Sequence, residues 1–294
     1  VGQGTSSPVP LQDLHTVLRR WARANSTTVS DGSRFQYFSA VCWFFGRQLY
    51  RSLGGNVPVG LISNNWGGTK IEQWLPSKST QPCGHQSTGE LHNAMIVPYT
   101  VGPMAVSGFT WYQGEADLGG DPNLPEQNHN YTCTQRALIG LWRQKFEVPD
   151  AFFALVLLST QLPSPSGMYL LPQLRDQQVA AVAQLKNAAY ASNADHGFGA
   201  DIHPVFKQYV GARLATAALS IVYGRPINWR SPSYASASQT ASGELTVQLH
   251  DVTEAGLTLK AVANVNKNLR LEDCPALNAK APRSCAWADL QFDD

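Results

Sequence analysis

The sequence is poor in charge: charged residues make up 15% of its 294 residues and leave a formal net charge of +1 at pH 7. This balance gives no broad electrostatic attraction toward nucleic acid or an anionic membrane, so we expect neither as a partner. No apolar run reaches the roughly 20 residues that a transmembrane helix needs. The first residues, Val1–Thr5, carry no initiator Met and no signal-peptide pattern, and we interpret them as a mature or truncated start.

Zinc-binding motifs are also absent, because none of the five cysteines forms a Cys-x-x-Cys pair. Cys42 falls on an apolar helical stripe, which is typical of a buried free thiol. The other cysteines lie in loop-like sequence that suits disulfides, with the pairing left open: Cys83, Cys133, Cys274 and Cys285. Asn25 and Asn130 each begin a glycosylation sequon. Sequons beside loop cysteines favour a secreted or lysosomal protein.

The chain is long enough, at 294 residues, for one large domain or a domain with a smaller companion. Short apolar runs predict strands at Val57–Ile62, Met104–Tyr112 and Phe152–Leu158. Helical periodicity predicts helices at Phe35–Leu49, Arg136–Phe146, Gln178–Tyr190 and Pro204–Tyr223. Strands that alternate with helices favour an α/β domain with a mostly parallel sheet covered on both faces.

The pattern changes after Gly224, where a serine-rich stretch is followed by runs typical of strands at Leu245–Leu249 and Leu257–Val262. No helical stripe returns. We therefore predict an α/β domain over residues 1–226 and part of a β-rich module over residues 227–294.

Asp201-Ile202-His203-Pro204 has the residues of the base half of a hydrolase triad. A histidine can take the proton of a nucleophile, and a carboxylate can orient the ring and stabilise its charged form. In an extended segment, residues two apart lie on one face, so Asp201 and His203 can act together. The alternative interpretation is a surface loop in which Asp201 caps a helix and His203 has no chemical role.

Gly67 and Gly68 follow the predicted strand that ends at Ile62, and Thr69-Lys70-Ile71-Glu72 matches a capping box that predicts a helix start at Thr69. Backbone N–H groups at such a helix start suit an anion or a developing oxyanion. The alternative is a tight turn in which glycine is needed only for its backbone angles.

A second candidate donor loop follows the strand that ends near Tyr112. Gln113 has a side-chain N–H for an oxyanion, Gly114 allows a sharp turn, and Glu115 either holds the loop or accepts a substrate hydroxyl. Ligands of α/β sheets collect beyond the carboxyl ends of strands. Aromatic packing at a strand end is the alternative, but two donor loops with an Asp/His loop together favour acyl transfer.

Several blocks resemble the sialate O-acetylesterase family of the SGNH-hydrolase superfamily. They are Phe38–Arg47, Gly60–Ile62 with Trp66–Trp74, His92–Ile96, Trp111–Glu115 and Asp201–Pro204. The resemblance covers most of the chain to about Tyr223. It implies a flavodoxin-like three-layer α/β/α fold and a serine esterase that removes O-acetyl groups from sialic acids or other acetylated glycans, without a metal or a cofactor.

The resemblance also implies roles for individual residues. His203 is the general base with Asp201 as its orienter, while Gln113, Gly67 and Gly68 supply oxyanion donors. Arg175, Glu115 and Asn64 are the candidates that face the substrate, although a structural salt bridge explains Arg175 equally well.

The family's serine lies in a Gly-Gln-Ser-Asn-type segment upstream of every matched block, and the printed sequence has no such segment. We assign the nucleophile neither to Ser6 nor to Ser63. Two alternatives therefore stand beside the sialate esterase: an inactive fragment or pseudoenzyme that only binds glycans, and an esterase of the acetylxylan type.

Overall fold

The computed structural model describes residues 2–30, 37–102, 104–118, 130–159, 170–197 and 202–252. Its centre is a parallel sheet of β3 (Gly108–Trp111), β4 (Phe152–Leu157) and β5 (Ala188–Ser192), in the order β3-β4-β5. Within it, β4 pairs with both neighbours, and Phe153 lies opposite both Phe109 and Ala188. The predicted parallel sheet is thus confirmed.

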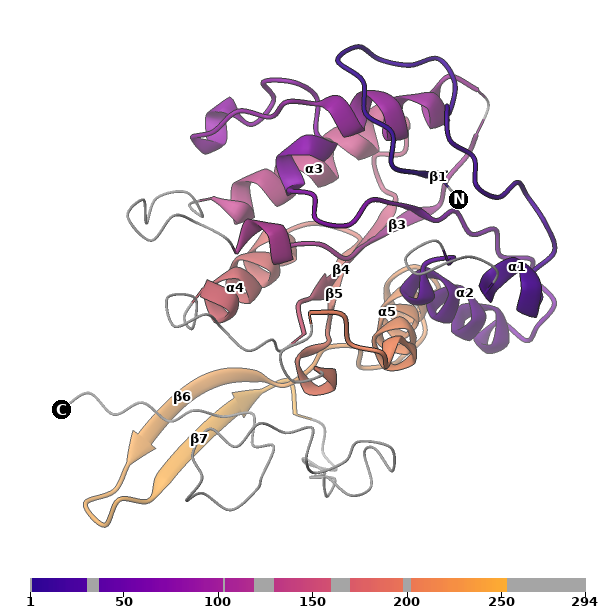
Figure 1. Cartoon of the computed structure of the whole chain (residues 1–294). Coiled ribbons are helices and arrows are strands. Elements are labelled where there is room, and N and C mark those ends of the chain that lie inside the picture. Colours follow the sequence, from indigo (N-terminus) through magenta and orange to yellow (C-terminus); the bar gives the residue numbers. More distant parts are fainter. Residues whose placement is uncertain are drawn as a thin grey trace, which may run out of the picture.

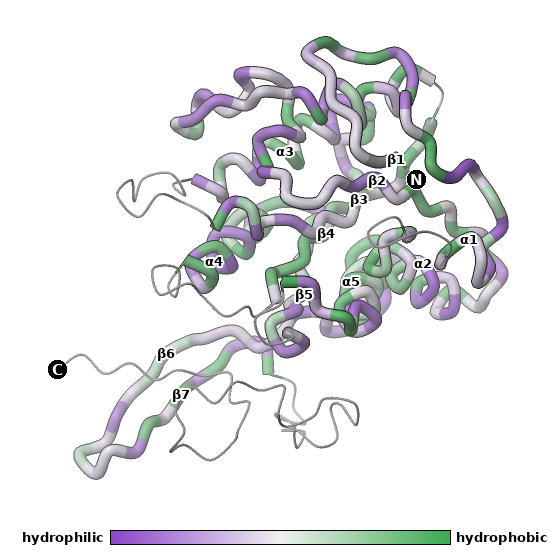
Figure 2. Tube along the Cα trace, viewed as in Figure 1, coloured by the Kyte–Doolittle hydropathy of each residue, from purple (hydrophilic) through white to green (hydrophobic). Residues whose placement is uncertain are grey.

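Helices cover both faces of this sheet (Figure 1): α3 (Tyr131–Lys145) and α4 (Leu170–Val182) lie on one side, α2 (Ala40–Ser52) and α5 (Lys207–Ile221) on the other. Alternation along β4 explains the two layers. Phe153 and Leu155 join the core cluster with α3 and α4, whereas Ala154 and Val156 join the cluster with α5. Figure 2 shows the hydrophobic stretches of β4, β5 and α5 side by side. The predicted three-layer α/β/α class is confirmed.

Glycine allows α2 and α5 to pack closely. A Cβ placed on Gly211 of α5 would lie 2.6 Å from the Cβ of Phe44 and 2.9 Å from the backbone N of Phe45. Real Cβ atoms do not approach other atoms so closely, so this crossing requires glycine at position 211.

Arg143 of α3 holds the amino ends of β4 and β5 together. Its Nη2 donates to the carbonyl of Ala151 at 2.7 Å, just before β4, and to those of Lys186 at 2.9 Å and Asn187 at 3.1 Å, just before β5. Its Nε donates to Ala151 as well, at 2.9 Å. One guanidinium therefore binds the starts of two neighbouring strands.

The predicted helix Gln178–Tyr190 is wrong in its second half. Helix α4 ends at Val182, and Tyr190 belongs to β5. Alanine-rich sequence favours a helix in isolation, but Ala189 and Ala191 are buried against the α5 side of the sheet. Tertiary packing of small side chains therefore overrides local propensity here.

The predicted strand Val57–Ile62 is also wrong, since these residues form no strand ladder. The nearest pairing is two residues long and parallel, between β1 (Gly2–Gln3) and β2 (Asn64–Asn65). A groove of about 1690 Å³ is lined by residues 58–62, by Met104 ahead of β3, by much of residues 13–24 and by side chains of α2. The sequence pattern thus identified a segment of strand-like composition that has no ladder partner among the described residues.

The remaining strands, β6 (Ser233–Gln239) and β7 (Leu245–His250), form an antiparallel hairpin that confirms the predicted strand Leu245–Leu249. Leu257–Val262 lies outside the described residues, and the domain boundary near residue 226 stays a prediction.

The shorter helical segments are α1 (Ser26–Ser30), η1 (Ile71–Trp74), η2 (Gln81–Cys83), η3 (His92–Ile96), η4 (Val97–Thr100), η5 (Glu115–Asp117) and η7 (Ala194–His196). None of the described helices is long and apolar enough to cross a membrane.

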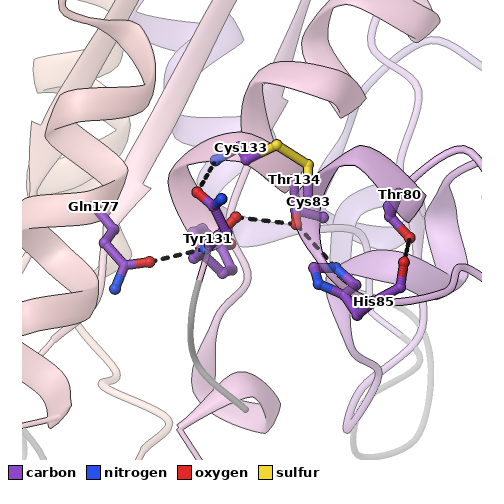
Figure 3. The surroundings of a disulfide bond; sticks show 8 residues. Thr80, Cys83, His85, Tyr131, Cys133, Thr134 and Gln177 are labelled. Carbon is purple, nitrogen blue, oxygen red and sulfur yellow. Dashed lines mark hydrogen bonds between the residues drawn. A yellow bond between two sulfur atoms is a disulfide. The ribbon is translucent and has the colours of Figure 1, made fainter. Parts of the chain in front are cut away.

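A disulfide joins Cys83 of η2 to Cys133 in the first turn of α3 (Figure 3). Beside it, the Oδ1 of Asn130 caps α3 by accepting from the N–H of Cys133 at 3.2 Å. Cys133 therefore lies in a helix rather than in the expected loop. Cys42 is a free cysteine, as predicted, and burial raises the pKa of its thiol to about 12.

Candidate active site

The carboxyl ends of β3, β4 and β5 meet at one edge of the sheet because the strands are parallel. The loop that begins at Tyr112 leaves β3 there, Ser159 follows β4, and Asn193 follows β5. His203 lies on the connection between β5 and α5. The candidate site is therefore built from loops at this edge.

The glycine turn is open to a ligand. Gly68 has a φ of +73°, and a Cβ on either Gly67 or Gly68 would meet nothing within 4 Å. The predicted helix start at Thr69 is wrong, because a 3₁₀ turn begins at Ile71 and the Oε1 of Gln73 accepts from the N–H of Lys70 at 2.7 Å. The Thr69 hydroxyl instead donates to the carbonyl of Trp66 at 2.8 Å.

Gln113 joins the glycine turn to the β3 loop. Its Nε2 donates to the carbonyl of Thr69 at 2.9 Å and to the carboxyl of Asp117, and its Oε1 accepts from the hydroxyl of Tyr131 at 2.9 Å. The structure thus brings the two predicted donor loops together. Both amide hydrogens of Gln113 are used in holding them, so its part as an oxyanion donor stays a prediction.

Asp117 is a site residue that the sequence reasoning missed. Its Oδ2 accepts from the backbone N–H of Ile71 at 3.2 Å, which ties the β3 loop to η1. Burial raises the pKa of Asp117 to about 7; the nearby charge of Glu72 acts in the same direction, and the hydrogen bonds from Gln113 and Ile71 act against it. Its place two residues after Glu115, in a loop already singled out, was the one available signal.

Glu115, in the β3 loop, is a buried carboxyl with charged groups nearby. Burial raises the pKa of its carboxyl, while the nearby charges of Lys207 and His203 act in the opposite direction. His203, which is itself exposed, therefore lies within electrostatic range of Glu115. Asp201 falls outside the described residues, so the geometry of the Asp201–His203 pair stays a prediction.

Tyr112 is surrounded by donors from other elements. The Nζ of Lys207 lies 3.2 Å from its hydroxyl and 4.4 Å from its ring centroid, and the Nδ2 of Asn193 donates to the hydroxyl at 3.3 Å. Burial, followed by the charge of Glu115, raises the pKa of the Tyr112 phenol to about 12. Lys207 and Asn193 carried no signal in the sequence that linked them to Tyr112.

The other two predicted substrate residues differ in their surroundings. The Nε of Arg175 donates to the carbonyl of Leu158 at 2.8 Å. Burial lowers the pKa of Arg175, and electrostatic interactions with Tyr112 and Asp176 act in the opposite direction. Asn64 is turned to the backbone, since its Nδ2 donates to the carbonyl of Met95 at 2.7 Å. Arg175 therefore lies within electrostatic range of Tyr112, and Asn64 is hydrogen-bonded to η3.

Ser63 is buried and has its hydroxyl occupied. It donates to the Oδ1 of Asn65 at 2.7 Å and accepts from the N–H of Ser39 at 3.0 Å. The nucleophile stays unassigned. Among the described residues, no three His, Cys, Asp or Glu side chains come together in a way that could hold a metal ion.

A known family matches most of the chain. The family described as "Carbohydrate esterase, sialic acid-specific acetylesterase" matches residues 11–220. The sialate O-acetylesterase of Homo sapiens is 36% identical over 245 residues, which cover 73% of this chain and 45% of that protein. The sialate O-acetylesterase of Pongo abelii is 35% identical over 251 residues, which cover 75% of this chain and 46% of that protein.

A solved structure has a similar fold. The carbohydrate acetylesterase from Xanthomonas citri superposes with a TM-score of 0.63 at 29% identity, covering 84% of this chain and 55% of that one. The chain spans about half the length of the curated relatives it matches.

Proposed function

The chain belongs to the sialic acid-specific acetylesterase family of carbohydrate esterases, and from this premise we propose that it forms the base-bearing part of an esterase that removes O-acetyl groups from sialic acids. The observation that supports the proposal most directly is the contact between the two predicted donor loops. Gln113 binds the glycine turn at Thr69, and Glu115 lies within electrostatic range of His203.

In the proposed reaction, His203 takes the proton of a serine hydroxyl while the serine oxygen bonds to the acetyl carbon. The carbonyl electrons move onto the oxygen, and donors near Gly67 and Gly68 stabilise this oxyanion. Return of the electron pair expels the sugar oxygen, which receives the proton from His203. Water then hydrolyses the acetyl-serine, with His203 as base again and Asp201 as its orienter.

The serine is not assigned to a residue of the printed sequence, and the family resemblance expects it at the end of a further strand. The groove along residues 58–62 supports this expectation, because a segment of strand-like composition there has no ladder partner among the described residues. We propose that a strand carrying the Gly-Gln-Ser-Asn-type segment occupies the groove.

The test is hydrolysis of O-acetylated N-acetylneuraminic acid and of p-nitrophenyl acetate by a polypeptide that includes such a segment. His203→Ala is expected to lower kcat at least about a hundredfold, since it removes the general base. His250→Ala, in the exposed hairpin strand β7, is the matched control and should leave kcat unchanged. An unchanged rate in His203→Ala would exclude this residue as the base.

A broader carbohydrate substrate is the second candidate. The similar structure from Xanthomonas citri is described only as a carbohydrate acetylesterase, and acetylxylan is one substrate of that wider class. Acetate release from acetylated xylan, compared with release from O-acetylated sialic acid at equal acetyl concentration, distinguishes the two. Preference for xylan would overturn the sialic acid proposal but not the role of His203.

The printed chain alone supports a further proposal, namely binding of acetylated glycans without hydrolysis, because no nucleophile is assigned in it. Titration with O-acetylated sialic acid, followed by NMR and with acetate measured in the same sample, tests this. Binding without acetate release is the expected result, and steady acetate release would show that the printed chain holds its own nucleophile.

We place the protein in a lysosomal or secreted setting. The disulfide between Cys83 and Cys133 supports this proposal, since disulfides persist in oxidising compartments. The exposed sequon residues Asn25 and Asn130 are expected to carry glycans. Treatment of the protein from secretory-pathway expression with an endoglycosidase should lower its apparent mass, and no shift would contradict the expectation.

A further inference from the structure

Positive charge gathers around the phenol of Tyr112 at the carboxyl edge of the sheet. Lys207 lies with its Nζ 3.2 Å from the Tyr112 hydroxyl. The guanidinium of Arg175, on α4, lies within electrostatic range of the same phenol. Two cations from different helices thus lie near one polar group.

Arg175 has hydrogen-bonding capacity left over. Its Nε is held by the carbonyl of Leu158 at 2.8 Å, whereas its Nη2 is buried and has no hydrogen-bond partner among the described residues. Buried guanidinium N–H groups are normally paired, because desolvating them without an acceptor is costly. A ligand oxygen that reached this group would complete its hydrogen bonds.

Acidic groups also lie near the two cations. Glu115 lies within electrostatic range of Lys207, and burial raises the pKa of its carboxyl. Asp176, within electrostatic range of Arg175, is exposed and screened by solvent. Helix α5 has no acidic residue in its first turn and no side-chain cap at Phe206. The positive end of the α5 dipole therefore adds to the positive potential around Lys207.

From this arrangement we propose that Lys207 binds the carboxylate of an acidic sugar directly, and that Arg175 adds a second charge and N–H donors. The site would select acidic sugars over neutral ones. This inference rests on the proposed function, since the chemistry that fits the site is the carboxylate of a sialic acid. Such a site orients the sugar by a group that does not react, and leaves the acetyl ester to the loops of Gly68 and His203.

The test is binding of the methyl glycoside of N-acetylneuraminic acid and of its methyl ester, which lacks the free carboxylate, by NMR titration of the full chain. We expect the acid to bind about tenfold more tightly than the ester, as one charge-assisted contact allows. Lys207→Gln should remove this preference by weakening only the acid form, and Arg175→Lys should reduce it. High salt should weaken binding of the acid more than that of the ester.

Lys186→Gln is the matched control, because Lys186 lies near the opposite edge of the sheet and pairs with Asp150 at 3.1 Å. It should leave both affinities unchanged. Equal binding of acid and ester by the wild-type chain, or equal weakening of both in Lys207→Gln, would overturn the carboxylate site while leaving sialic acid binding intact. No binding of either form would refute the proposed sialic acid function itself, and this inference with it.

Discussion

Asp117→Asn is expected to remove a pH dependence from the stability of the protein. Burial raises the pKa of Asp117 from 3.8 to about 7. As the pH rises through this window, the unfolded chain loses the proton first and the folded chain retains it. The contribution of Asp117 to the free energy of unfolding therefore falls between pH 4 and pH 8, and the rise of its pKa from 3.8 to about 7 corresponds to a fall of about 4 kcal/mol.

Asparagine keeps an oxygen acceptor for the N–H groups of Gln113 and Ile71 and cannot ionise. The assay is urea unfolding followed by tryptophan fluorescence at half-unit steps from pH 4 to pH 8, with the disulfide intact. The quantity of interest is the difference in unfolding free energy between wild type and variant, because other titrating groups cancel in it. This difference should change by about 4 kcal/mol in favour of the variant as the pH rises.

Parallel stability curves for the two proteins would refute the reasoning, since they would mean that Asp117 titrates alike in the folded and unfolded states. A change of the opposite sign would mean that the hydrogen bonds from Gln113 and Ile71 outweigh burial and lower the pKa. The pH at which the slope of this difference falls to half its maximum gives the folded-state pKa.

Two further predictions concern packing and the covalent link. Gly211→Ala should destabilise the protein by about 1–3 kcal/mol, because its Cβ would meet Phe44 at 2.6 Å. Gly140→Ala, on an open face of α3 with nothing within 4 Å, should be neutral or stabilising by up to about 1 kcal/mol; equal effects in urea unfolding would contradict the packing argument. Replacing Cys83 and Cys133 by alanine should cost about 4 kcal/mol for a 50-residue separation, and an unchanged thermal midpoint would refute it.

Helices with a clear apolar stripe were predictable, and strands that depend on distant partners were less so. The stripe that predicted a helix over Pro204–Tyr223 was confirmed as α5, with shorter ends. Strand β5 was missed because Ala188–Ser192 has the composition of a helix, and only its burial between β4 and α5 makes it a strand. Val57–Ile62 was predicted as a strand from composition alone, although a strand needs a ladder partner.

The residues of the candidate site were also unequally predictable from the sequence. Motif residues such as Gly68 and Gln113 could be named from their positions after strand-like runs. The pairing of Tyr112 with Lys207 could not, because 95 residues separate them and the contact depends on how α5 meets the sheet. Nor could the sequence reveal that Gln113 directs both amide hydrogens to protein groups.

The guanidinium of Arg143 has a consequence for how this protein can evolve. By binding the carbonyls that precede β4 and β5, it fixes the register of two strands from the edge that carries no candidate chemistry. Loops at the opposite edge can then gain, lose or exchange residues without shifting the strands beneath them. A change of substrate preference in these loops therefore requires no change in the frame that aligns them.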